Sequence, residues 1–154
     1  MNIHQKLAEL HLTLPPAPKP VAAYIPAVTA GGLVFISGQL PLDQGKLLSA
    51  GPVPSAVSIE QAQAAARQCA LNAMAVLDQE LAGDWSRFIR IVRIGVFVAC
   101  EAGFTEQAKV ANGASEFLAL VLGEAGRHAR ATVGVPALPL GATVEVEMTV
   151  QVAQ

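Results

Sequence analysis

Charged residues are scarce in this chain of 154 residues. Asp, Glu, Lys and Arg make up 14% of it, where an ordinary soluble domain has about 25%. The ten Lys and Arg are scattered rather than grouped, and the formal net charge is −2, so the sequence lacks the basic patch typical of nucleic-acid binding. We therefore expect no nucleic acid among its partners.

Long apolar runs are missing as well. Although 53% of the residues are hydrophobic, no run approaches the roughly 20 residues of a membrane-spanning helix. The first ten residues, MNIHQKLAEL, interleave acid and base and lack the apolar core and cleavage site of a signal peptide. We expect a cytoplasmic protein without a membrane partner, whose surplus apolar surface is buried in an oligomer.

Cysteine is nearly absent. Cys69 and Cys100 form no CxxC motif, and no histidine is spaced to share a metal with them, so we expect two buried apolar side chains and no metal site. His128 stands two residues before Arg130 and is the most interesting of the three histidines. A histidine at the start of a strand is nevertheless more often an ordinary loop residue.

The chain fits one domain with an N-terminal extension. Ile3, Leu7, Leu10 and Leu14 recur every three or four residues and predict an amphipathic helix over residues 2–14. The run PPAPKP at 15–20 ends that helix and forces an extended linker. We expect residues 1–20 to form this helix and linker, and residues 21–154 to form the folded domain.

Alternating and helical patterns predict the order ββ(β)αβαββ. Gly31 and Gly32 join a hairpin over 21–28 and 33–37, with Tyr24 on its first strand, and a short third strand follows the turn at 43–46. A capping box at Ser58 opens a helix over 58–81, a strand covers 89–100, and Thr105 caps a second helix that ends at Gly123 or Gly126. Both helices can cover one face of a single mixed sheet, which is an α+β architecture.

The last two strands carry most of the local charge. Alternation places Arg130 and Thr132 opposite their apolar neighbours, and likewise Glu145 and Glu147. We expect all four, with Arg93 and Phe97, on the sheet face that the helices leave open. Two interpretations remain: a solvated face, or a guanidinium that binds a carboxylate beside a carboxylate that acts as a base. Packing identical sheets in a ring would bury this face.

Several motifs resemble the Rid family, the YjgF-like reactive-intermediate (enamine and imine) deaminases. They are ISGQLPL at 36–42, VFV at 96–98, VANGASEF at 110–117 and, most specifically, RxxVxVxxLPxxxxVEVE from Arg130 to Glu147. The resemblance covers residues 21 to 154. It implies a chorismate-mutase-like fold, a homotrimer with active sites between subunits, and hydrolysis of 2-aminoacrylate-type enamine or imino acids to 2-keto acids and ammonium, without cofactor or metal.

The resemblance also implies roles for individual residues. Arg130 corresponds to the arginine that pairs with the substrate carboxylate, and Glu145 to the carboxylate that positions or activates water. Glu147 is expected to be a structural partner. The other expected substrate contacts are Tyr24, Ser37, Gly38, Asn112 and the backbone of Thr132.

Thr132 departs from the family pattern, because the best-known members carry cysteine two residues after the arginine. The arginine site survives this change, but thiol chemistry there is excluded. The leading helix further suggests a distinct branch with its own substrate. A non-catalytic trimer that binds a keto or amino acid is the alternative function. The acidic chain argues against a ribonuclease, and too few cations converge for a chorismate mutase.

Overall fold

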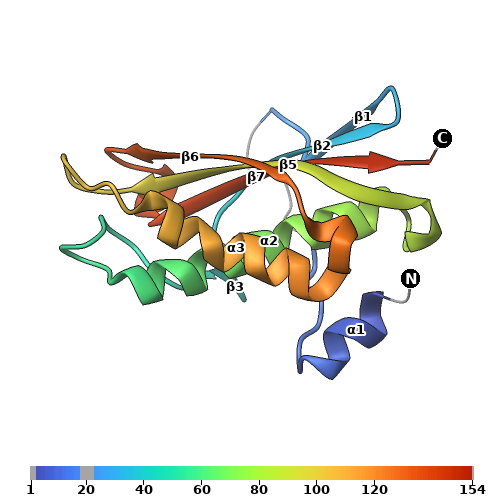
Figure 1. Ribbon diagram of the computed structural model, residues 1–154, viewed down its shortest axis with the longest axis horizontal. Coiled ribbons are helices and arrows are strands. Elements are labelled where there is room, and N and C mark those ends of the chain that lie inside the picture. The colour runs from blue at the N-terminus through green and yellow to red at the C-terminus, as the bar shows by residue number, and fades with distance from the viewer. Residues whose placement is uncertain (1–2, 18–22, 154) are drawn as a thin grey trace.

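The computed structural model describes residues 3–17 and 23–153 and consists of one mixed sheet with helices on one face. The five strands lie in the order β1-β2-β7-β5-β6, with β5 and β6 parallel and the other pairs antiparallel. Their bounds are Ala27–Ala30, Leu33–Gln39, Val144–Val152, Phe88–Ala99 and Ala129–Val135 in that order. Helices α2 (Ile59–Glu80) and α3 (Gln107–Leu122) lie beneath the sheet in Figure 1. The predicted α+β architecture is confirmed.

Helix α2 begins where its sequence requires. The Ser58 hydroxyl accepts from the Gln61 amide at 3.1 Å, and the Gln61 side chain accepts from the Ser58 amide at 2.9 Å, so the predicted capping box forms. Twelve residues of α2, many of them alanines, are buried against the sheet and α3. The small side chains allow this helix to lie close to its neighbours.

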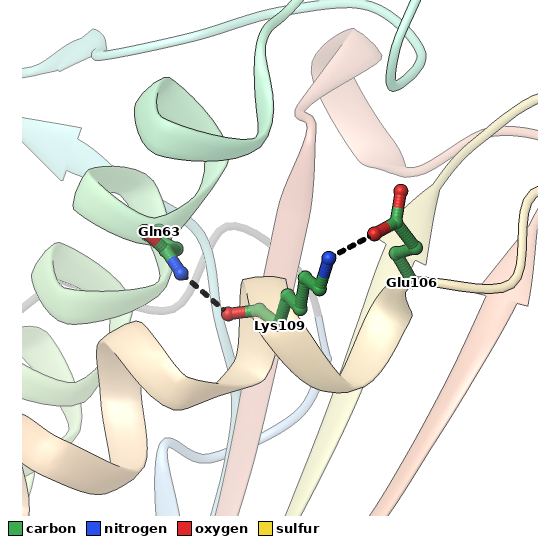
Figure 2. Close-up of polar contacts among 3 residues, drawn as sticks. All are labelled: Gln63, Glu106 and Lys109. Atoms are coloured by element: carbon green, nitrogen blue, oxygen red, sulfur yellow. Dashed lines mark hydrogen bonds and ion pairs between the residues drawn. The ribbon is translucent and has the colours of Figure 1, made fainter.

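The two long helices approach each other closely at Gly113. A Cβ atom there would lie 2.1 Å from the Gln63 carbonyl oxygen, so only glycine fits. Nearby, the side-chain amide of Gln63 donates to the backbone carbonyl of Lys109 at 2.8 Å, while the Lys109 ammonium pairs with the Glu106 carboxylate (Figure 2). The close approach at Gly113 and the Gln63 hydrogen bond fix the register of α3 against α2.

The start of α3 differs from the prediction. Its N-cap is Glu106, with no side-chain hydrogen bond, so the assignment of Thr105 as the cap is wrong. The helix ends at Gly123, whose φ of 62° lies in the left-handed region that favours glycine, as predicted. The 3-10 turn η2 (Gly123–Gly126) then leads into β6; the other two are η1 (Trp85–Arg87) and η3 (Pro139–Gly141).

Buried and exposed side chains alternate along strand β5 with one interruption. Ile91, Ile94, Val96 and Val98 are buried on the helix face, whereas Val92, predicted to lie with them, is 37% exposed. The ladder to β7 shifts register between Ile91 and Arg93, and this irregularity inserts one residue into the alternation. Beyond it Arg93 and Phe97 lie on the open face, as predicted.

The N-terminal helix α1 (Ile3–Glu9) is shorter than predicted and belongs to the core. Ile3 and Leu7 are fully buried in the same apolar cluster as the sheet and the two long helices. Asp78 of α2 accepts from the Trp85 indole at 2.6 Å and lies 3.4 Å from the His4 imidazole, which holds α1 against the helical layer. Part of the predicted proline linker, at 18–20, lies outside the described residues.

The first hairpin is also shorter than predicted. Strand β1 begins at Ala27, so Tyr24, predicted on this strand, lies in the segment before it and is 49% exposed. Residues 21 and 22 lie outside the described residues. A small ribbon of β3 (Leu42–Asp43) and β4 (Lys46–Leu47) follows β2. No helix in the described part of the chain is long and apolar enough to cross a membrane.

Candidate functional site

The strand register places Arg130 and Glu145 on opposite faces of the sheet. Arg130 is paired with Ile94, which is buried under the helices, so the Arg130 side chain lies on the helix face at the β6 edge. Glu145 is paired with Phe97 and lies on the open face. The prediction that Arg130 and Thr132 share the open face with Glu145 and Glu147 is therefore wrong.

Arg130 is held by neutral oxygens of α3. Its Nη1 donates to Asn112 Oδ1 at 3.0 Å and to Ser115 Oγ at 3.1 Å, and its Nη2 donates to the Ala108 carbonyl at 3.5 Å. Among the described residues, no carboxylate forms an ion pair with Arg130. The guanidinium is thus positioned but not neutralised, and Asn112 lies beside it, as the resemblance implied.

Ser115 and His128 lie beside Arg130 and Asn112 and form one group with them. Ser115 Oγ lies 3.0 Å from His128 Nε2, and His128 Nδ1 lies 2.6 Å from the Gly126 carbonyl oxygen. A cavity of about 350 Å³ opens over Ser115, His128 and Arg130 and is also lined by Glu116, Ala119 and Arg127. The sequence contains a signal for both residues: Ser115 follows Asn112 by three residues on the helix, and His128 lies directly before β6, two residues from Arg130.

A second group forms on the open face around Gly38. The β2–β7 ladder is irregular between Ile36 and Gln39, and the Glu145 side chain lies over Gly38. A Cβ atom at Gly38 would be 1.8 Å from Glu145 Oε1. Ser37 lies beside this contact, and its hydroxyl donates to the Ile25 carbonyl at 3.0 Å, which ties down the segment that carries Tyr24.

The surroundings of Glu145 raise the pKa of its carboxyl group. Burial raises the pKa of its carboxyl group above the ordinary value, and the neighbouring Glu147 raises it further. Glu147 itself pairs with Arg93 at 3.1 Å, in keeping with a structural role. A carboxyl group whose pKa is shifted toward neutrality is suited to general acid–base chemistry.

The remaining predicted site residue, Thr132, lies on the helix face between Arg130 and Gly134. Its Oγ1 is buried and has no hydrogen-bond partner. The predicted residues therefore form two groups that do not meet within one chain: Arg130 with Asn112 on the helix side, and Glu145 with Ser37 and Gly38 on the open side. Over residues 3–17 and 23–153, no cluster of His, Cys, Asp and Glu could hold a metal ion.

The open face also exposes large apolar side chains. Val28 is paired with Phe35, and Val133 with Phe97, so all four lie on the same side as Glu145. Val28 is 48% exposed, Phe35 46% and Val133 49%. Such a cluster around charged groups is typical of a surface that another protein chain covers.

Comparison with known proteins identifies the family. A family model described as YjgF/chorismate mutase-like matches residues 4–152. Its description also contains the word endoribonuclease. Protein TCP17 of Trypanosoma cruzi is 42% identical over 97% of this chain and 94% of its own.

Two other matches are a solved structure of unknown function and a named enzyme. The crystal structure of Atu1372 from Agrobacterium tumefaciens, a protein of unknown function, has a TM-score of 0.92 and 44% identity, and the match covers 98% of this chain and 92% of that one. A 2-iminobutanoate/2-iminopropanoate deaminase of Dermatophagoides farinae is 27% identical over 90% of this chain and 93% of its own. This chain belongs to the YjgF family, the Rid proteins that its Arg130 motif resembles.

Proposed function

We propose that this protein hydrolyses small 2-imino acids, of the 2-aminoacrylate type, to 2-keto acids and ammonium, in clefts between the chains of a homotrimer. The observation that carries this proposal is the Arg130 guanidinium. Three neutral oxygens orient it and no carboxylate of the described chain neutralises it, so it can pair with the carboxylate of a small acid.

One relative supports this chemistry, a 2-iminobutanoate/2-iminopropanoate deaminase that is 27% identical to this chain. The word endoribonuclease in the family description fits this chain less well, because its net charge is −2 and its ten basic residues are scattered.

The chemical task is modest. A protonated imine reacts readily with water, so the site has to hold the acid, favour the imine over the enamine and place one water molecule. Arg130 would hold the carboxylate, and Glu145 would take the proton of the attacking water, for which its raised pKa suits it. Glu145 then gives this proton to the nitrogen of the carbinolamine, which leaves as ammonia while the carbonyl forms, and the proton of the carbinol hydroxyl goes to that ammonia.

Arg130 and Glu145 would have to come from different chains. They lie on opposite faces of one sheet, so neither can reach a ligand bound at the other. A neighbouring chain that covered the exposed Val28, Phe35 and Val133 would bring its own Arg130 edge to the Glu145 side.

The activity test uses a threonine dehydratase acting on serine, which releases 2-aminoacrylate. Added protein should accelerate pyruvate and ammonium release. Arg130→Lys keeps the charge but loses the planar fork, so we expect kcat/KM to fall about 10- to 150-fold, the equivalent of about 1.5–3 kcal/mol for hydrogen bonds to a charged group. Arg67→Lys changes an exposed arginine of α2 that lies over the Phe117 ring, outside the Arg130 group; it is the matched control and should retain full activity.

A complementation test addresses the shared site. Arg130→Ala and Glu145→Gln chains, each inactive alone, should regain activity when co-expressed, because a site built from two chains is intact in about a quarter of random pairings. No acceleration by the wild-type protein would refute the deaminase. Arg130-dependent pyruvate binding without turnover would instead support a non-catalytic sensor, and inactive mixed oligomers would refute the shared site alone.

A further inference from the structure

The cavity beside Arg130 holds a hydroxyl and an imidazole in a defined arrangement. His128 Nδ1 lies 2.6 Å from the Gly126 carbonyl oxygen, which can only accept, so this nitrogen carries the proton. His128 Nε2 is then the unprotonated nitrogen, and the Ser115 hydroxyl at 3.0 Å donates to it. Gly126 thus fixes the tautomer in which the imidazole can accept the serine proton.

The surroundings keep this imidazole neutral. Burial lowers the pKa of His128 below its ordinary value, and the nearby Arg130 lowers it further, while the hydrogen bond to Gly126 opposes the shift. At neutral pH the ring is therefore a base rather than a cation. A neutral imidazole hydrogen-bonded to a hydroxyl is the arrangement that activates serine nucleophiles.

The positive charge next to the serine completes the arrangement. Arg130 Nη1 donates a hydrogen bond to Ser115 Oγ at 3.1 Å. This oxygen would carry negative charge once its proton had moved to His128. A guanidinium at this position would also stabilise the oxyanion that forms when Ser115 attacks a carbonyl group. The cavity of about 350 Å³ is large enough for a short ester.

We propose that Ser115 is a nucleophile and His128 its general base, so that the cavity beside Arg130 has a second activity, the hydrolysis of small acyl esters. Ser115 Oγ forms a bond to the ester carbonyl carbon as its proton passes to His128 Nε2. The ester C–O bond then breaks, and the His128 proton passes to the departing alcohol oxygen. Water repeats the two steps on the acyl-serine, releasing the carboxylic acid and restoring both side chains. This activity goes beyond the imine hydrolysis proposed above and does not depend on it.

The first test uses a fluorophosphonate probe, which reacts with base-activated serines, followed by peptide mass spectrometry. We expect the adduct on Ser115 of the wild-type protein. His128→Gln can still occupy the space and accept a hydrogen bond but cannot take the proton, so labelling should slow by about 100-fold, within the range of general-base catalysis. Hydrolysis of p-nitrophenyl acetate by the wild type should begin with a stoichiometric burst of nitrophenolate.

The matched controls are Ser55→Ala and His11→Asn, which change an exposed serine and an exposed histidine outside the cavity. Both should react like the wild type, whereas Ser115→Ala should lose the adduct and the burst. The site mapping and His128→Gln need no Ser115 variant, so they decide the matter even if Ser115→Ala fails to fold. An adduct elsewhere, no adduct at all, or normal labelling of His128→Gln would mean that Ser115 and His128 only position Arg130, and would overturn the proposal.

Discussion

Two glycine-to-alanine substitutions should separate function from stability. At Gly38 the new methyl carbon would lie 1.8 Å from Glu145 Oε1, 2.7 Å from Cδ and 3.0 Å from Cγ, so the carboxylate has to leave its position. These atoms are the end of a flexible side chain on the open face, which can rotate away. We therefore expect a change in unfolding free energy within about 0.5 kcal/mol, as for an ordinary surface substitution.

The same displacement should be costly for activity. If Glu145 activates the water, moving it should lower the acceleration of the dehydratase reaction by about 100-fold, within the usual contribution of a general base. Because Gly38→Ala displaces this carboxylate, most of its loss should already be present in a Glu145→Gln background, where the two substitutions should not be additive. Full activity of Gly38→Ala, with the carboxylate necessarily displaced, would refute the assigned role of Glu145.

Gly113→Ala is the opposite case. Its Cβ atom would lie 2.1 Å from the Gln63 carbonyl oxygen, which is backbone and cannot rotate away. Overpacking of this kind costs about 1–3 kcal/mol, offset by up to about 1 kcal/mol of helix propensity gained over glycine. We expect a net loss of about 1–2 kcal/mol, or about 2–8 °C in Tm by thermal denaturation. Equal Tm values for the Gly38→Ala and Gly113→Ala proteins would contradict the distinction between a side-chain contact that can move and a backbone contact that cannot.

Two further outcomes are expected. Because the pKa of Glu145 is raised in the folded state, its ionisation costs stability above that pKa. Glu145→Gln should therefore be more stable than the wild type near pH 8, and the difference should shrink as the pH falls from the raised pKa to the ordinary glutamate value of 4.5. Equal differences in unfolding free energy at pH 4 and pH 8, measured by chemical denaturation, would contradict this. Leu7→Ala should lower the unfolding free energy by about 2–5 kcal/mol, because Leu7 is fully buried in the shared core, and a cost below about 1 kcal/mol in urea denaturation would show that α1 is a loose appendage.

Local chemistry made much of the fold predictable. Ser58 and Gln61 marked the start of α2, Gly123 marked the end of α3, and the alternating valines of 144–152 identified a strand with one buried side. These features depend on neighbours within a few residues, which the sequence displays directly. Tyr24 and Thr105 were misplaced because the exact start of an element depends on tertiary contacts as well as on local preference.

The side of β6 that faces the helices was not predictable in this way. Alternation correctly separated Arg130 and Thr132 from Ala131 and Val133, but it could not say which side faces α3. The apolar side was assigned to the core, whereas the structure turns it outward and leaves Val133 49% exposed. A strand whose apolar side is the exposed one misleads the usual rule, because alternation alone does not show which side the helices cover.

The placement of the two charged groups constrains the symmetry of the proposed assembly. A two-fold dimer that packed the open faces together would place Glu145 against the same surface of its partner and leave both Arg130 edges outside. Joining the Arg130 edge of one chain to the Glu145 face of the next is a head-to-tail contact, and such contacts either close into a ring or continue as a filament. A closed ring would cover Val28, Phe35 and Val133 on every chain and would complete every proposed site, so the proposed homotrimer fits the exposed apolar face and the proposed chemistry together.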